Sequence, residues 1–453
     1  MRFLALLAIL GAIPIFRAML RTPGGLKAAC FLVGILPFSL NMLNLDFALV
    51  NWAGWPGYAK GAVITVLDSL SIAILIWQRR VFWKLPFRGV FLTYLAAITL
   101  SVFSSSDPEA SSFYTFQLLR MFALYAAVAA IAQRPASLRW LLYGIASAAV
   151  LEGAVTLYQR LNGVFQAEGT MAHQNMLGLM LHFVTLPLFA LLLSGARKKI
   201  LVLGLAGSLL AVSLGASRAT IGFLSGGLIL LTVLSLWRSA TVRKWKAVGL
   251  GLAAVALASP LAIQGLDQRF ATAIEAGGYD ERAAFERAAK MMLADHPLGV
   301  GANHYVVSAN LGGYSERAGV AWNSGSRAAH VHNLYLLTGA EAGWLGILTL
   351  IALFAWPIWI GFKFALGERR DPRGDLVLGI AVAMCVTAVH NLYEWVFISY
   401  QAQYVFATGL GIIAGLTRQR QRERDALRQT SRARIAQSRI GQTEDGAAPG
   451  LQP

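Results

Sequence analysis

The chain has 453 residues, of which 57% are hydrophobic and only 13% are charged. Soluble domains usually carry about 25% charged residues, and here the apolar residues fall in long uninterrupted runs. This composition excludes an ordinary soluble enzyme and predicts a polytopic membrane protein. The net charge of +17 belongs mostly to short segments between apolar runs, as expected where Lys and Arg orient helices. We therefore attribute the charge to topology and do not expect nucleic-acid binding.

The apolar runs begin at the N-terminus, where residues 1–20 have the composition of a signal peptide. No small-residue cleavage site follows them, and Arg17 and Arg21 lie on their far side, so we expect a retained helix. Later runs include 219–237 and 247–263. About 20 apolar residues cross a bilayer, and backbone amides in lipid need helical partners. The prediction is an all-α protein with about 12–13 transmembrane helices, depending on whether the first run fully spans.

Basic clusters predict the orientation of these helices, because cytoplasmic connections are rich in Lys and Arg. Consecutive clusters are separated by two apolar runs each, so all of them fit on the cytoplasmic side. The chain then divides into a transmembrane domain, 1–416, with one large periplasmic loop, 264–331, and a basic, partly disordered cytoplasmic tail, 417–453. The clusters are Arg79 to Arg88, Arg134 with Arg139, 197–199, 238–246 and 369–373. The predicted short outer turns are 51–60, 104–112, 161–172, 215–218 and 390–395.

The loop 264–331 differs from the other connections in its length, its mixed charge and its Gly, Asn and Ser clusters. Loops of this length are usually functional or disordered. Asp280 is expected to cap a helix over 281–294 that ends at His296 and Pro297. Because this helix and several aromatic residues argue against disorder, we expect chemistry in the loop.

Two charged residues interrupt predicted membrane helices, where a charge is costly and points to function. Arg120 lies inside the run 113–132, and Glu152 lies inside the run 140–160. Either the two residues pair with each other and hold the bundle together, or Arg120 contacts an anionic ligand.

Three arginines are predicted on the outer side. Arg218 lies in the sequence GASRAT, where Gly and Ser permit a tight turn and a helix begins. A helix N-terminus with a guanidinium suits a phosphate, which we favour over an anchor that reaches the lipid headgroups. Arg282 and Arg287 lie on the predicted loop helix, where arginines are usually solvated and Arg282 is also spaced to pair with Glu286.

Histidines at the outer rim are candidates for general-base chemistry on a hydroxyl. His330 and His332 lie in the sequence HVHN, just before an apolar run. A metal site is less expected, because no cysteine or carboxylate cluster with ligand spacing accompanies them. A structural histidine at a helix start is the remaining alternative. His173 and Asn175, at another outer turn, are expected to line the same cavity.

The chain resembles the O-antigen ligase and polymerase superfamily in four stretches that come in order. They are EGTMAHQNMLGLM (168–180), SRAT (217–220), ERAAFERAAKMMLADHPLGVGANHY (281–305) and HNLYLLTGAEAGWLGI (332–347). The resemblance extends over about residues 113–416. It implies a glycosyltransferase-C-like membrane architecture with one large outer loop. It also implies transfer of a glycan from an undecaprenyl pyrophosphate carrier to an acceptor hydroxyl, with no metal or other cofactor.

By motif, the resemblance implies three essential residues: Arg218, Arg282 and His332. The family arginine often follows a glycine, whereas Glu281 precedes Arg282 here, so Arg287 remains an alternative. His330 likewise remains an alternative to His332. Two guanidiniums would stabilise the negative charge on a pyrophosphate leaving group, and the imidazole would deprotonate or orient the attacking hydroxyl. Attack opposite the leaving group predicts inversion at the anomeric carbon.

The predicted function is therefore that of a glycosyltransferase in a bacterial inner membrane, with its active site facing the periplasm. A ligase acting on a lipid A core or another glycan acceptor and an O-antigen or exopolysaccharide polymerase fit the residues equally. A transporter of lipid-linked glycans would place ionisable residues near the bilayer midplane and contain discontinuous helices. A scaffold would leave the outer arginines and His332 without a role. Further residues expected to bind substrate are Arg120, His173, Asn175, Arg287, His330, Asn333 and Glu341.

Overall fold

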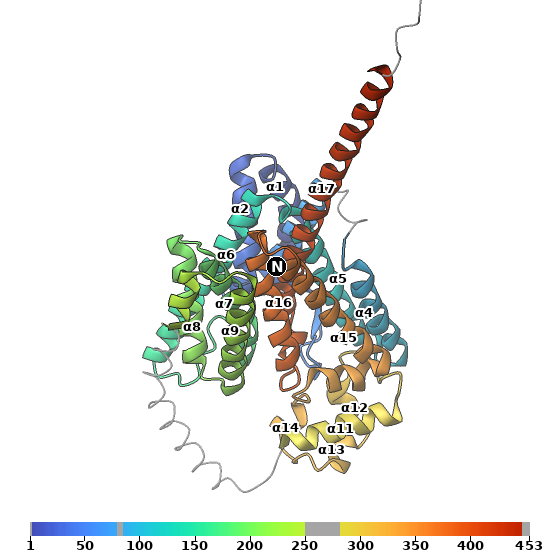
Figure 1. The fold of residues 1–453 in the computed structure, drawn as a ribbon. Helices are drawn as coiled ribbons and strands as arrows, with labels where there is room; N and C mark the ends of the chain where they lie inside the picture. Colours follow the sequence, from blue (N-terminus) through green and yellow to red (C-terminus); the bar gives the residue numbers. More distant parts are fainter. Residues whose placement is uncertain (1, 79–84, 250–280, 446–453) are drawn as a thin grey trace, which may run out of the picture.

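The computed structural model describes residues 2–78, 85–249 and 281–445, and these residues are mostly helical (Figure 1). Six of the described helices are long and apolar enough to cross a membrane. They are α5 (Pro108–Ile131), α6 (Pro135–Leu161), α7 (Gln174–Ser194), α9 (Arg218–Arg238), α15 (Leu334–Gly367) and α16 (Arg373–His390). The predicted all-α class is therefore confirmed, together with helices fit to span a membrane.

Shorter apolar helices pack among these six. They are the part Ile9–Met19 of α1 (Arg2–Met19), α2 (Pro23–Ser39), α3 (Val66–Trp77), α4 (Arg88–Ser101) with the 3-10 turn η2 (Val102–Ser104), and α8 (Lys199–Gly215). The predicted number of 12 or 13 spans thus exceeds the six described helices of spanning length. The predicted run 247–263 lies, beyond residue 249, outside the described residues.

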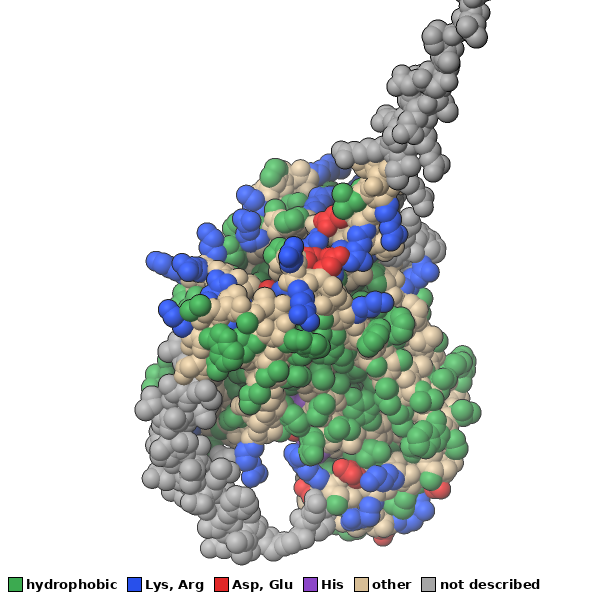
Figure 2. Space-filling view, viewed as in Figure 1, with side chains coloured by type: hydrophobic (Ala, Val, Ile, Leu, Met, Phe, Trp, Pro, Cys, Tyr) green, Lys and Arg blue, Asp and Glu red, His purple; other side chains and the backbone are tan. Residues whose placement is uncertain are grey.

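Charged side chains gather at the two ends of the helical bundle, and the band between them is mostly apolar (Figure 2). At one end, α17 (Tyr400–Asp445) leaves the bundle and continues as a single helix past residue 416. We call the part of α17 at this end of the bundle its base. The opposite end carries four helices of the predicted loop (Figure 1). A belt with few charges between two charged ends is the surface pattern of a protein that lies across a bilayer. The four helices are α11 (Glu281–Asp295), α12 (Tyr305–Leu311), α13 (Tyr314–Arg317) and α14 (Ser324–Ala328).

We call residues 281–333 the loop domain. Its first helix, α11, matches the helix predicted over 281–294. The predicted cap Asp280 and the rest of segment 264–280 lie outside the described residues. The loop domain is therefore an ordered, helical part of the molecule over the residues that the structure describes.

A small hairpin is the exception to the helical fold. Strand β1 (Asp46–Asn51) pairs antiparallel with β2 (Gly61–Thr65), around an outer turn predicted at about the same place. The turn contacts the loop domain at Asn303, whose carbonyl accepts from the Trp55 indole N–H (3.1 Å). The Asn303 side chain accepts from the Ala59 N–H (2.9 Å). The hairpin thus supports the loop domain from the N-terminal half of the chain.

A break in α15 provides the second support of the loop domain. At Gly343 the backbone adopts φ 65° and ψ −164°, which interrupts the helix. The motif segment 297–301 lies against this break and replaces the lost helical partners, as buried backbone groups require. Three hydrogen bonds cross the break: Val300 N–H to the Ala340 carbonyl (3.0 Å), Gly301 N–H to the Glu341 carbonyl (2.9 Å) and Trp344 N–H to the Pro297 carbonyl (3.1 Å).

Arg120 lies inside the bundle and pairs with Asp68, not with Glu152. Its Nε donates to the Asp68 carboxylate at 2.8 Å, and both side chains are buried. Glu152 accepts instead from the Thr170 N–H at 3.0 Å. The predicted pairing of Arg120 with Glu152 is therefore wrong. Asp68 was not singled out in the sequence analysis as a partner of Arg120. Asp68 forms a capping box with Thr65 at the start of α3, and this local role by itself explains an acidic residue there.

We expect Gly343→Ala to destabilise the protein by about 2 kcal/mol or more, because an L-residue is strained at this φ and ψ. A Cβ would also collide with the Pro297 carbonyl. Thermal unfolding in detergent measures the change. Gly367→Ala is the control within the same helix, since its Cβ would meet no atom within 4 Å; equal stability of the two variants would contradict the role of the break.

Candidate active site

A cavity of about 900 Å³ opens at the end of the bundle that carries the loop domain. Its walls come from the turn before α7, the start of α9, the start of α11 and the turn after α16, so distant parts of the sequence meet there. The lining residues are Phe165, Gln166, Gln174, Asn175, Ala216, Ser217, Arg218, Ala219, Arg282 and Glu394. Two arginines and one carboxylate among these residues make the cavity polar and charged.

Arg218 reaches the cavity because a tight turn joins α8 to α9. Ala216 adopts a left-handed conformation with φ 50°, and Ser217 caps α9 by accepting from the Thr220 N–H. Gly178 of α7 lies directly against Thr220, where a Cβ would collide with its side chain. The predicted turn and helix start are therefore confirmed. Arg218 is the first residue of α9 and has no carboxylate partner among the described residues.

Arg282 lies in the first turn of α11 and lines the cavity. Its guanidinium is 3.6 Å from the Glu394 carboxylate and its side chain is 53% exposed, so it remains open to a ligand. Arg287, on the same helix, donates to the Ala318 carbonyl at 2.9 Å and is not among the lining residues. Of the two alternatives, Arg282 is the arginine that faces the cavity.

His332 lies next to the cavity wall, with Nδ1 3.5 Å from the Glu394 carboxylate and 28% of its side chain exposed. His330 is instead buried, and its ring stacks on Trp395 at 4.6 Å between centroids. Burial, reinforced by the neighbouring His332 imidazole, lowers the pKa of His330 to about 3. Asn333 caps α15 by accepting from the Leu336 N–H. Only His332 therefore combines exposure with a carboxylate partner.

Glu394 lies between Arg282 and His332 and contacts both. It was not identified in the sequence analysis. Its side chain is only 3% exposed. Its carboxylate accepts from Asn175 Nδ2 at 2.7 Å and lies beside both Arg282 and His332. A buried carboxylate needs such partners to offset its desolvation. The sequence offered one signal, a single acidic residue in the predicted outer turn 390–395. Acidic residues are common in turns, so this residue did not indicate a functional site.

Three other predicted binding residues are not among those that line the cavity. His173 is exposed and caps α7 by accepting from the Asn175 N–H (3.1 Å). Glu341 is buried at the break in α15 and accepts from the Tyr58 hydroxyl (2.6 Å). Arg120 is held by Asp68. The structure does not bring these three side chains to the cavity, and their predicted contacts with substrate remain without support.

The arrangement suits a doubly charged phosphate group beside a hydroxyl. Arginine binds phosphate through several directed N–H groups, and the first turn of α9 adds a helix N-terminus. No protein-family model matches this chain, and comparison with curated proteins finds no significant match. The function is therefore inferred from the site geometry and from the sequence motifs.

We expect Arg218→Gln and Arg282→Gln each to weaken binding of inorganic pyrophosphate by about tenfold to a hundredfold, the effect of one lost hydrogen bond to a charged group. Isothermal titration calorimetry on the purified protein measures the affinity. Arg287→Gln removes the same charge from the same helix as Arg282→Gln but leaves the cavity intact, and should bind as the wild type does. A loss of similar size in Arg287→Gln would contradict the assignment of Arg282.

Proposed function

We propose that this protein transfers a glycan from an undecaprenyl pyrophosphate carrier to an acceptor hydroxyl. The observation that carries the proposal is that distant segments meet at one cavity: Arg218 of α9 and Arg282 of α11 line it together with Glu394, and His332 from the end of the loop domain lies beside Glu394. Arg218, Arg282 and His332 are the residues that the family resemblance implies to be essential. A polar cavity at the edge of an apolar belt also suits a substrate with a lipid tail and a charged, sugar-bearing head.

In this proposal the arginines act on the leaving group. Breaking the bond between the anomeric carbon and the pyrophosphate oxygen leaves additional negative charge on the diphosphate. Arg218 and Arg282 stabilise that charge as it develops, without needing a metal ion. Each 1.36 kcal/mol of such stabilisation is a tenfold gain in rate.

His332 acts on the acceptor. Its Nδ1 faces the Glu394 carboxylate, which leaves Nε2 for the acceptor hydroxyl. The hydroxyl oxygen bonds to the anomeric carbon, its proton passes to Nε2, and the pyrophosphate leaves on the opposite side, which inverts the anomeric configuration. Glu394 orients the imidazole and stabilises the imidazolium that forms, as a carboxylate does in other imidazole-based sites.

A transporter is less well supported by the same observations. The intramembrane charge Arg120 is buried and fully paired with Asp68, which suits a structural role. The break in α15 is filled by the loop domain and so does not leave free backbone groups for an ion. Both features that a transporter would use are already occupied by the protein itself.

We further propose that the cavity faces the periplasm across the inner membrane of a bacterium. The end opposite the cavity carries the basic loop 369–373 and the basic base of α17 (Figure 2). Cytoplasmic segments carry an excess of Lys and Arg, so this end is assigned to the cytoplasm. Ligase and polymerase activities share this chemistry and differ in the acceptor, either a lipid A core or another glycan.

We expect His332→Ala to lower the rate of glycan transfer by about 10²- to 10⁴-fold, the usual contribution of a general base. Purified protein is incubated with a lipid-linked glycan and candidate acceptors, and product is followed by mass spectrometry. His296→Ala is the control, because it removes an exposed imidazole of the loop domain that does not line the cavity. Wild-type transfer by His332→Ala would refute the mechanism.

Glu394→Gln should separate chemistry from anion binding. The amide keeps the size of the side chain and an oxygen for Asn175, but it removes the negative charge beside His332 and Arg282. We expect kcat for transfer to fall about tenfold or more, while pyrophosphate binds at least as tightly as in the wild type. Wild-type kcat in Glu394→Gln would contradict a role of Glu394 in the chemistry.

A further inference from the structure

A second recess, of about 830 Å³, lies at the end of the bundle opposite the cavity. It is formed by the loop between α15 and α16 and by α17 where that helix leaves the bundle. Charged side chains of both signs gather around the base of α17 (Figure 2). The lining residues are Glu368, Arg369, Arg370, Asp371, Pro372, Arg373 and Gln419.

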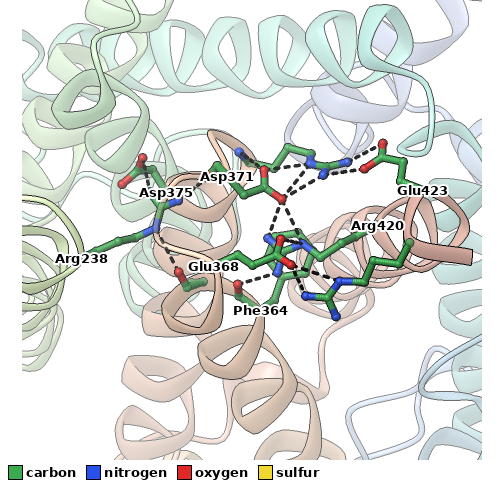
Figure 3. A network of polar contacts seen from close by, with 10 residues as sticks. Arg238, Phe364, Glu368, Asp371, Asp375, Arg420 and Glu423 are labelled. Atoms are coloured by element: carbon green, nitrogen blue, oxygen red, sulfur yellow. Dashed lines mark hydrogen bonds and ion pairs between the residues drawn. The ribbon is translucent and has the colours of Figure 1, made fainter. Parts of the chain in front are cut away.

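The acidic residues of this region are already paired (Figure 3). Asp371 accepts from Arg373 at 2.9 Å and from Arg420 at 2.6 Å. Burial acts to raise the pKa of Asp371, but the hydrogen bonds from these arginines outweigh it and hold the pKa at about 2. Arg373 also pairs with Glu423 at 2.8 Å. Arg373 and Arg420 are therefore already paired with carboxylates of the protein.

Glu368, the other carboxylate that lines the recess, pairs with Arg424 and with Arg420. The network therefore consists of three arginines and three carboxylates, and its formal charges cancel. Any further arginine in the recess adds uncompensated positive charge.

Two such arginines are present. Arg369 and Arg370 are exposed and line the recess, and neither forms an ion pair with a carboxylate among the described residues. The Arg369 guanidinium lies over the Trp237 ring, 5.6 Å from its centroid. The recess thus offers an anion two guanidiniums that no carboxylate among the described residues pairs.

Buried side chains hold the backbone of the loop that forms the recess. Arg238 is buried at the end of α9, where it donates to the Ala365 carbonyl at 3.0 Å and to the Asp375 carboxylate at 2.6 Å. Gly374 packs directly on its guanidinium, because a Cβ there would collide with it. Arg420 lies over the Phe364 ring on the other side. A recess fixed in this way loses little conformational freedom when a ligand binds.

The surroundings of the recess indicate a lipid. Trp237 near the end of α9 and Trp359 on α15 are 60% and 61% exposed, and tryptophan concentrates where hydrocarbon meets headgroups. Exposed apolar residues such as Val233 and Trp356 continue from there into the apolar belt. We propose that the recess binds the headgroup phosphate of an anionic phospholipid through Arg369 and Arg370, with the acyl chains along the exposed faces of α9 and α15.

The test uses the full-length protein in neutral detergent. Phosphatidylglycerol should raise the Tm of the wild type by about 3 °C, and phosphatidylcholine should not. The double variant R369Q/R370Q should lose this shift and should bind phosphatidylglycerol at least tenfold more weakly in native mass spectrometry. The matched control is R197Q/K198Q, which removes the same charge from two exposed residues at the turn between α7 and α8.

Three results would overturn the proposal. The first is an equal loss in R197Q/K198Q, which would show that net charge alone attracts the lipid. The second is an equal shift with phosphatidylcholine, which would show a general detergent or lipid effect. The third is an equal shift with soluble glycerol phosphate, which would identify a free anion as the ligand. None of these readouts depends on glycan transfer, so they are independent of the proposed function.

Discussion

The candidate active site depends on the contacts that the buried Glu394 carboxylate makes. A carboxylate that is nearly inaccessible to water must be compensated by donors and positive charge. The protein supplies Asn175 from α7, Arg282 from the loop domain and His332 from the segment before α15. One desolvated charge therefore ties the loop domain to the helical bundle, and it fixes the positions of two residues that the proposed chemistry requires.

Backbone hydrogen bonds add to the apolar contacts that hold the loop domain, whose buried residues belong to the main hydrophobic core. The break at Gly343 exposes helical carbonyls and an N–H, and segment 297–301 pairs with them. Asn303 pairs with the hairpin turn on the other side. Unsatisfied backbone groups are costly near lipid, so both junctions resist separation. A long connection between helices thereby becomes a fixed wall of the cavity.

Opposite charges are organised differently at the two ends of the molecule. At the cavity, Arg218 and Arg282 are left accessible, as a charged substrate requires. At the other end, arginines and carboxylates cancel in a closed network, and beside it Arg369 and Arg370 form no ion pair with a carboxylate among the described residues. The apolar belt between the ends keeps the two sites apart. The two proposed anion sites therefore lie at opposite ends of the molecule.

The sequence by itself determined the helical class, the turn at Arg218 and the helix that carries Arg282, because apolar runs, caps and glycines act on neighbouring residues. It left Arg282 and Arg287 as alternatives, as it did His330 and His332, since either member of each pair fits the local pattern. Tertiary structure, through helix rotation and burial, decided which member of each pair lies at or beside the cavity. It also paired Arg120 with Asp68 and revealed Glu394, because contacts between residues far apart in the chain depend on packing that no local pattern records.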